Sequence, residues 1–336
     1  MTEQQQAIQF ANPPQIDGFQ ARFFRDNNDF SAMAKIFNAS SKAFGHKNVV
    51  GATELQNQYH NTPNSDLTQD LIILEVDQQA IGYAFTHWYD EAVGNRIFRT
   101  LAHIKPEWIN RGIGHAILTH QEQRQRAVHA ANPTNKPAFL QTHASDTNSY
   151  SAKLYAEFGY QPIRHSFSMK RDLSQPIGSQ ALPEGIEVRP STPELYRQIW
   201  QADAESFRDH WGFSEPSETD FQRWTQSPLF QPAIWQVAWS GDQVVGMVLN
   251  YFDQKENAEY NRQRGYTESI SVRRPWRKQG VASALINRSL AMFREMGMTE
   301  AALGVDSENL TGALSVYQQC GFEVEYRSST HRKPLA

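Results

Sequence analysis

Hydrophobic and polar residues alternate along the stretch Tyr266–Val272, which reads YTESISV. Ile270 and Val272 are β-prone, and Tyr266 and Glu268 lie in phase with them, so the stretch is predicted to be a strand. Basic and small residues follow it. The next segment, VASALINRSLAMFREM at 281–296, has strong helix formers and a broad apolar stripe. The pattern therefore predicts a strand, a glycine-containing turn and a helix.

The same kind of pattern repeats along the chain. From Phe19 the order is strand, two helices, three strands, helix, strand, helix and strand, and the order recurs after about 165 residues. Residues 172–184, DLSQPIGSQALPE, have no periodicity and are predicted to be a linker. We therefore expect an α/β (α+β) protein of two tandem domains, at 19–171 and 185–336, after a flexible tail at 1–18.

Bulk composition narrows the class of protein. A chain of 336 residues exceeds what one core usually serves, which agrees with two domains. The net charge of −4 does not suggest nucleic acid, and no apolar run reaches the roughly 18 residues of a membrane span. The N-terminus lacks the features of a signal peptide, and a single cysteine fits a reducing compartment. We expect a cytoplasmic protein with no membrane or nucleic-acid partner; its oligomeric state stays open.

The turn before 281–296 has the chemistry of an anion site. The first N–H groups of a helix have no internal partner, and they attract negative charge. Gly280 and Ala282 carry no bulk, while Arg277 and Lys278 add positive charge. A pyrophosphate would fit there, and the alternative is an ordinary strand-to-helix connection.

Two motifs together resemble the Gcn5-related N-acetyltransferase (GNAT) family: RKQGVA at 277–282 and NLTGALSVYQQCGF at 309–322. The resemblance implies, twice, a mixed sheet whose fourth and fifth strands splay apart to receive acetyl-CoA between them, with helices on either side. A β-bulge in the fourth strand would free an N–H for the thioester carbonyl at Val272. The pyrophosphate would be held by Arg277, Lys278, Gln279, Gly280, Val281 and Ala282.

The reaction that the resemblance implies is attack of an amine on the thioester. An amine is protonated at neutral pH, so a base is needed. Glu268 is placed on the face of Val272 by strand alternation, and Tyr266 is a second candidate for the base. In the alternative reading Glu268 only neutralises a nearby arginine, one of Arg262, Arg264 and Arg273.

Tyr317 matches the family tyrosine whose phenol lies near the departing sulfur, so it is the expected acid. Asn309 matches an asparagine that contacts the pantetheine arm, although asparagine is also an ordinary helix N-cap. Cys320 has no histidine partner in a recognisable motif and is expected to be buried packing. No histidine spacing typical of a metal site occurs among the eleven histidines, so no metal is expected.

The first half keeps part of the pattern. In an ungapped alignment, Ile109 stands where Arg277 does, Thr100 where Glu268 does and Phe98 where Tyr266 does. Tyr155 in YAEFGY matches Tyr317 in YQQCGF, and Asn148 matches Asn309 with a shift of one residue. The phosphate turn is retained as Arg111, Gly112, Ile113 and Gly114. We expect a degenerate first domain without a carboxylate base; whether it binds CoA stays open.

The acceptor is expected to contact the segments RDHWGFSEPSETDFQRW and NYFDQKENAEYNRQRG, which combine acidic and aromatic residues. Such residues suit a cationic amine, and a solvated charged loop is the alternative. Two hypotheses follow from the sequence. One is an acetyl-CoA-dependent N-acetyltransferase that acetylates a primary amine by direct attack in a ternary complex in the second domain. The other is a non-catalytic CoA-binding protein.

Overall fold

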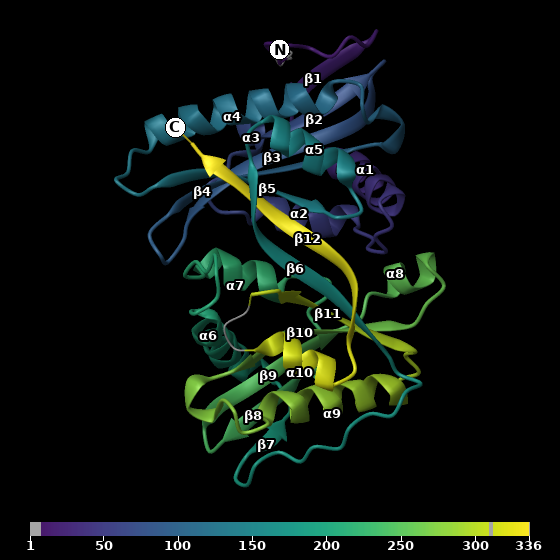
Figure 1. Ribbon diagram of the computed structural model, residues 1–336, viewed down its shortest axis with the longest axis vertical. Coiled ribbons are helices and arrows are strands. Elements are labelled where there is room, and N and C mark those ends of the chain that lie inside the picture. The colour runs from purple at the N-terminus through teal and green to yellow at the C-terminus, as the bar shows by residue number, and fades with distance from the viewer. Residues whose placement is uncertain (1–7, 309–311, 336) are drawn as a thin grey trace. The chain divides into compact units, whose positions relative to one another are not determined.

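The structure is a computed structural model, and it describes residues 8–308 and 312–335. The chain forms two compact units (Figure 1). The first unit comprises Met1–Ile163, Glu218–Gln226 and Ser328–Ala336, and the second comprises Arg164–Ser217 and Ser227–Arg327. The units therefore cut across the predicted ranges 19–171 and 185–336, which stay a prediction about the sequence repeats.

The first unit has a mixed sheet flanked by helices, with strand order β1-β2-β3-β4-β5-β12. Only the β4–β5 pair is parallel. The strands are β1 (Phe19–Phe23), β2 (Leu71–Val76), β3 (Gln79–Asp90), β4 (Arg96–Ile104), β5 (Ala138–Ser145) and, through its residues 328–334, β12 (Glu323–Pro334). The helices are α1 (Asp29–Ala43), α2 (Ala52–His60), α3 (Leu67–Asp70), η1 (Pro106–Trp108), α4 (Ile113–Ala131), α5 (Ser149–Glu157) and α7 (Glu218–Thr225).

The second unit repeats this plan, with strand order β6-β11-β10-β9-β8-β7 and one parallel pair, β10–β11. The strands are β6 (Gln161–Asp172), β7 (Glu187–Arg189), β8 (Gln236–Ser240), β9 (Gln243–Tyr251), β10 (Arg264–Val272) and β11 (Glu300–Asp306). The helices are η2 (Pro193–Leu195), α6 (Tyr196–Phe207), η3 (Pro232–Ile234), α8 (Gln254–Glu259), η4 (Arg274–Trp276), α9 (Val281–Glu295) and α10 (Ala313–Gln319). The predicted strand, turn and helix are thus β10, the turn with η4, and α9.

The last strand of each repeat pairs with the fifth strand of the other repeat. β12 runs antiparallel to β5, and β6 runs antiparallel to β11. The two sheets are completed by exchange, a feature that the order of elements along the sequence does not reveal.

The predicted splay is confirmed in both units. Parallel pairing of β10 with β11 covers only 264–266 and 300–302, although both strands continue beyond these residues. In the first unit it covers 96–99 and 138–141. The strands therefore separate at the ends from which α9 and α4 follow.

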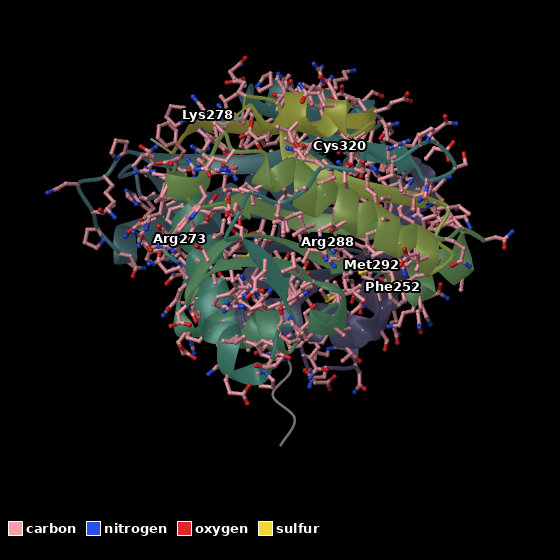
Figure 2. The ribbon with its side chains drawn as sticks, turned by 90° about the horizontal axis from the view of Figure 1, so that it is seen from below. Phe252, Arg273, Lys278, Arg288, Met292 and Cys320 are labelled. Carbon is pink, nitrogen blue, oxygen red and sulfur yellow. The ribbon has the colours of Figure 1, made fainter. Side chains whose placement is uncertain are left out.

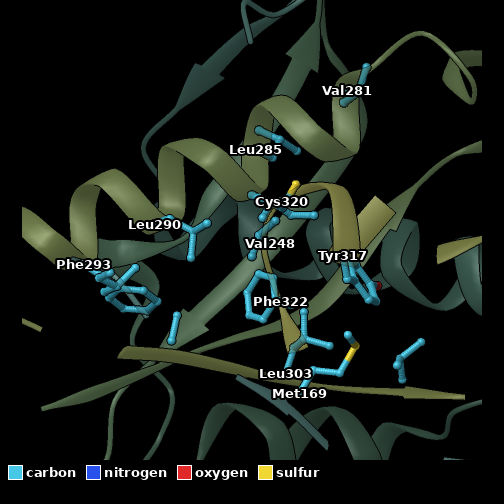
Figure 3. Packing of buried hydrophobic residues seen from close by; sticks show 14 of the residues in the cluster. Met169, Val248, Val281, Leu285, Leu290, Phe293, Leu303, Tyr317, Cys320 and Phe322 are labelled. Atoms are coloured by element: carbon cyan, nitrogen blue, oxygen red, sulfur yellow. The ribbon is translucent and has the colours of Figure 1, made fainter. Parts of the chain in front are cut away.

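The core of the second unit lies between its sheet and α9. Leu290 and Phe293 of α9 point toward the sheet in Figure 3, and together with Val281 and Leu285 they belong to one buried cluster. Cys320 is in the same cluster and is 8% exposed, which confirms that it is buried packing.

Two segments that were predicted to lack regular structure pack against cores. Ile8, Phe10 and Ile16, in the predicted tail, contact the first unit's core, because three apolar side chains in a polar segment are enough to dock it. Ile177 and Leu182, in the predicted linker, contact the core of the second unit. Within residues 8–308 and 312–335, no helix is long and apolar enough to cross a membrane.

Candidate active site

A β-bulge interrupts β10 just where the strand leaves its parallel partner. Glu268 pairs with Leu249 of β9 and Ser271 pairs with Met247, so three steps along β10 face two along β9. Ser269 takes a φ of 46°, which is uncommon for a residue with a side chain. A bulge leaves backbone groups without ladder partners, as the sequence resemblance implied. In this strand the bulge lies at Ser269 and Ile270, which precede Val272.

The bulge changes which side chains share a face. Because Leu249 and Met247 are two residues apart on β9, their partners Glu268 and Ser271 lie on the same face of the sheet. Val272 pairs with Gly246 and lies on the opposite face. The expectation that Glu268 and Val272 share a face is therefore wrong, since alternation fails where one extra residue is inserted. A role for the Val272 N–H stays a prediction.

Glu268 occupies the opening between the two splayed strands. The Gly304 N–H of β11 hydrogen-bonds its carboxylate, and a Cβ atom on Gly304 would lie 4.0 Å from Oε1. The absence of a side chain at Gly304 therefore leaves room for this carboxylate. Burial raises the pKa of Glu268 to about 7, although the Gly304 hydrogen bond acts in the opposite direction. A carboxylate with this pKa can accept a proton at neutral pH.

The three arginines near Glu268 in the sequence bind other carboxylates. Arg262 pairs with Glu256, Arg264 with Glu300 and Glu325, and Arg273 with Glu205. In the part of the chain that the structure describes, Glu268 forms no ion pair. The reading of Glu268 as a structural partner of an arginine therefore has no support.

Asp203 of α6 is a second carboxylate at the bulge, and the sequence reasoning missed it. Ser271 Oγ donates to Asp203 Oδ1 over 3.1 Å, and the Ser269 side chain also bonds this carboxylate. Burial raises the pKa of Asp203 to about 7 against these hydrogen bonds, which lower it. Asp203 thus contacts both serines of the strained segment.

The two faces of the sheet carry different helices. Asn250, opposite Thr267, donates to Ser289 of α9 over 2.9 Å, whereas Ser271 reaches α6. Glu268 and Asp203 therefore lie on the α6 side of the sheet, and α9 lies on the other side.

Tyr266, the second candidate for the base, is held in a network of its own. Its hydroxyl donates to Glu256 of α8 and accepts from Arg262 Nη2 at 3.1 Å. Its ring stacks on Tyr251 at 4.8 Å. Burial raises the pKa of Tyr266, and the Glu256 carboxylate raises it further, so the phenol stays protonated at neutral pH. A protonated phenol that is already held by Glu256 and Arg262 is a poor base, and its ring lines the site.

Tyr317 of α10 is 6% exposed and lies close enough to Glu268 to feel its charge. Burial raises the pKa of Tyr317, and Glu268 adds to the shift, so its proton is retained. Asn309 lies outside the described residues. Its proposed counterpart in the first unit, Asn148, accepts from Ser151 N at 3.0 Å and acts as a helix N-cap.

The phosphate turn has the backbone of an anion site. Lys278 has a φ of 61° and Gly280 a φ of 82°, and no side chain of the described residues caps the start of α9. Lys278 is exposed in the turn (Figure 2), whereas Val281 is buried and Ala282 begins the helix with it. The N–H groups at this end are therefore available to a ligand.

The Arg277 side chain stabilises this turn through hydrogen bonds to backbone carbonyl groups. Its Nε donates to Val272 O over 2.9 Å, and its Nη2 donates to Ser206 O over 3.1 Å. Gln279 Nε2 donates to Pro275 O over 3.1 Å. The side chains of both residues thus hold the backbone of the turn, and direct contacts from them to a pyrophosphate stay a prediction.

Acidic residues of the predicted acceptor segments form ion pairs and helix caps within the protein. Asp209 binds Arg274 and Arg277, and Asp253 caps α8 through the Lys255 and Glu256 N–H groups. Among the described residues, no group of three or more histidine, cysteine, aspartate or glutamate side chains could hold a metal ion.

The first unit keeps the turn but lacks the bulge. Asn110 and Gly112 have φ values of 62° and 81°, which match those of Lys278 and Gly280. Arg111 lies over the Trp108 ring at 4.9 Å, and Ile113 is buried. The register of β4 with β3 is continuous over all nine residues of β4, from Arg96 to Ile104.

The missing bulge corrects the alignment of the halves. Thr100 faces α4, where Gln125 Nε2 donates to it over 2.9 Å, just as Thr267 faces α9. Thr267 is therefore its counterpart, and Leu101 is the counterpart of Glu268, because the second strand has one extra residue. The ungapped match of Thr100 with Glu268, and with it that of Phe98 with Tyr266, is wrong, but the first unit still has no carboxylate there.

Residues 196–322, which contain β10, the turn, α9 and α10, match the model of the Acetyltransferase (GNAT) family. This segment of the second half is therefore similar to the GNAT family of acyltransferases, whose members use acetyl-CoA as co-substrate.

Relatives extend the likeness to most of the chain. A mycothiol acetyltransferase from Geodermatophilus obscurus is 25% identical over 295 residues, which are 87% of this chain and 90% of that protein. One from Thermobispora bispora is 30% identical over 174 residues, which are 51% of this chain and 58% of that protein.

Solved structures agree. A GCN5-related N-acetyltransferase from Sphaerobacter thermophilus superposes with a TM-score of 0.69 at 26% identity, covering 95% of this chain and 96% of that one. A tandem GNAT protein from the clavulanic acid biosynthesis pathway shares the fold, with a TM-score of 0.67 at 13% identity over 95% of this chain and 99% of that one. The predicted tandem GNAT fold is confirmed.

Proposed function

We propose that this protein is an acetyl-CoA-dependent N-acetyltransferase that acetylates a primary amine, with the chemistry in the second unit. One observation carries the proposal. Glu268 is a half-buried carboxylate without an ion pair, with a pKa of about 7, at the point where β10 leaves β11 and bulges. A base at this place is what attack on a thioester at neutral pH requires.

Each group has a defined task. Glu268 takes a proton from the ammonium group, directly or through a water molecule, and the freed nitrogen attacks the thioester carbonyl carbon. Backbone N–H groups released by the bulge stabilise the oxyanion. As the carbon–sulfur bond breaks, the Tyr317 hydroxyl transfers its proton to the sulfur, which leaves as the thiol, and the second proton that the attacking nitrogen loses restores the phenol. The α9 N-terminus, held by Arg277, binds the pyrophosphate of the carrier.

The acceptor is proposed to be a small cationic amine. Two carboxylates, Glu268 and Asp203, lie on the α6 face beside the stacked rings of Tyr251 and Tyr266. This setting suits a polyamine, an aminoglycoside or an amino-sugar conjugate, and the acceptor of the mycothiol acetyltransferases is a further candidate because those relatives span most of the chain.

A thiol-release assay tests the proposal. The purified chain is mixed with acetyl-CoA and a panel of these amines, and free CoA thiol is measured over time. We expect amine-dependent release with at least one acceptor. Tight binding of CoA without release for any amine would contradict the proposal and favour a CoA-binding protein.

A further inference from the structure

The nucleotide cleft of the first unit is filled by one of its own side chains. The Gly114 backbone N–H, in the first turn of α4, is a hydrogen-bond donor to the hydroxyl of Tyr150 on α5. A Cβ atom on Gly114 would lie 2.5 Å from that oxygen and 2.6 Å from Leu154 Cδ2. Helix α5 therefore lies directly on the glycine turn, and the phenol occupies an N–H that a pyrophosphate would need.

Little space is left beside Tyr150, whereas a separate pocket of about 640 Å³ lies against Arg111, Gly112 and His115. The cavity between β4, α4 and α5 has a volume of about 50 Å³. Its walls include Thr100 and Ala102 of β4, Gly114 of α4, and Tyr150 and Tyr155 of α5. Sites for ligands of drug size usually measure roughly 300–1,000 Å³, so a pantetheine arm has no room here.

At the corresponding place, the described residues of the second unit have no such side chain. When YAEFGY is set against YQQCGF, Tyr150 corresponds to Gly312. A Cβ atom on Gly312 would have no atom of the described residues within 4 Å. Gly312 also has a φ of 74°, a conformation that a tyrosine rarely adopts. The neighbour of Gly280 is Gln180, an exposed side chain that can move aside.

We propose that Tyr150 closes the nucleotide cleft of the first unit, so that each chain binds a single acyl-CoA, in the second unit. The proposal rests on the proposed function only in that the second unit binds acyl-CoA. The regular register of β4 separates the two units independently, because the first unit lacks the additional backbone N–H that the bulge of β10 takes out of the ladder with β9.

Calorimetric titration of the full chain with CoA tests the proposal, and one equivalent is expected. Ala282→Glu places a negative charge at the start of α9 and should weaken this binding by at least a hundredfold, while thermal unfolding shows that the variant is folded. Two equivalents in the wild type, or one equivalent that Ala282→Glu leaves unchanged, would overturn the proposal.

Two variants of the closing residue sharpen the test. Tyr150→Gly should add a second, weaker equivalent of CoA, whereas Tyr150→Phe keeps the ring in the cleft and should stay at one. A folded Tyr150→Gly chain that still binds one equivalent would overturn the role of Tyr150. One bound CoA without acetyl transfer would contradict the proposed function alone, and no binding at all would contradict both proposals.

Discussion

The two units share the backbone of one turn and differ in nearly everything that chemistry needs around it. Each turn has two residues with positive φ: Asn110 and Gly112 in the first unit, and Lys278 and Gly280 in the second. For the two residues with side chains, such a conformation costs of order 1–3 kcal/mol. The turn is therefore a property of the strand-to-helix connection that both units retain, and it is insufficient evidence for catalysis by itself.

The differences lie in the strand before the turn and the helix that faces it. The second unit has the bulge, and the first unit has none. Glu268 is replaced in the first unit by Leu101. When IFNASSKAF at 36–44 is set against IWQADAESF at 199–207, Ser40 replaces Asp203. The bulge and the two carboxylates thus occur together in the second unit and are both missing at the matching places of the first, which is why we assign the proposed chemistry to the second unit.

The largest effect that would test this difference is expected from Glu268→Gln. The amide keeps the shape of the side chain but cannot accept the ammonium proton, so turnover should fall about 10²- to 10⁴-fold. Leu101→Met, a volume-conserving change at the matching place in the first unit, should leave turnover unchanged. Steady-state kinetics with a saturating amine measures both. If turnover of Glu268→Gln fell by less than threefold, the assignment of Glu268 as the base would be wrong.

The pH profile follows from the same carboxylate. The pKa of Glu268 is raised to about 7, and only its ionised form accepts a proton. Below pH 7, kcat/KM should therefore fall about tenfold per pH unit and should level off above it. This acidic limb should vanish in Glu268→Gln. A limb that persists unchanged in the variant would assign it to another group, and Asp203 is the first to consider.

Tyr317→Phe should have the next largest effect. Loss of the hydroxyl removes the hydrogen bond to the departing sulfur, and we expect kcat to fall about 10²-fold, at the low end for acid–base catalysis, because a thiolate is already a good leaving group. The affinity for CoA should change little. Tyr155→Phe, the same change in the closed cleft of the first unit, is the matched control and should leave kcat unchanged. Equal effects of the two variants would contradict the asymmetry of the units.

Much of this site could be predicted from the sequence because its signals are local. The apolar pattern of β10 and α9, the small residues of the turn and the tyrosine of α10 all lie within short segments. The bulge could not be predicted. YTESISV alternates without a break, and Ser269 is no glycine, so nothing local marks the extra residue. Its register depends on pairing with β9, a contact between distant segments.

The exchange of the final strands and the position of Asp203 at the bulge could not be predicted from the sequence either, because both depend on contacts between distant segments. Strand order depends on partners far away in the chain, and one aspartate on an amphipathic helix resembles a solvent-facing residue. Gly304 was a usable signal, because a glycine inside a strand often marks the close approach of another group. Here that group is the Glu268 carboxylate.

Asp203→Asn should have a smaller effect on activity than Glu268→Gln or Tyr317→Phe. Asp203 touches the serines of the bulge, so it is a positioning residue, and an asparagine keeps one oxygen acceptor while losing the charge. A hydrogen bond of this kind is worth about 1 kcal/mol, which corresponds to a fall of roughly five- to tenfold in kcat/KM for acetyl-CoA. The KM of the amine should change less. Ser40→Ala in the first unit is the control and should have no effect.

Ser271→Ala removes the same hydrogen bond from the other side. If Asp203 acts by holding the bulge, the effects of Asp203→Asn and Ser271→Ala should not add in the double variant, because both remove one interaction. If Asp203 were the base, Asp203→Asn would abolish the acidic limb near pH 7 and Ser271→Ala would not. That outcome would move the proton acceptor from β10 to α6, while Ser40 would still leave the first unit without a carboxylate at the matching place.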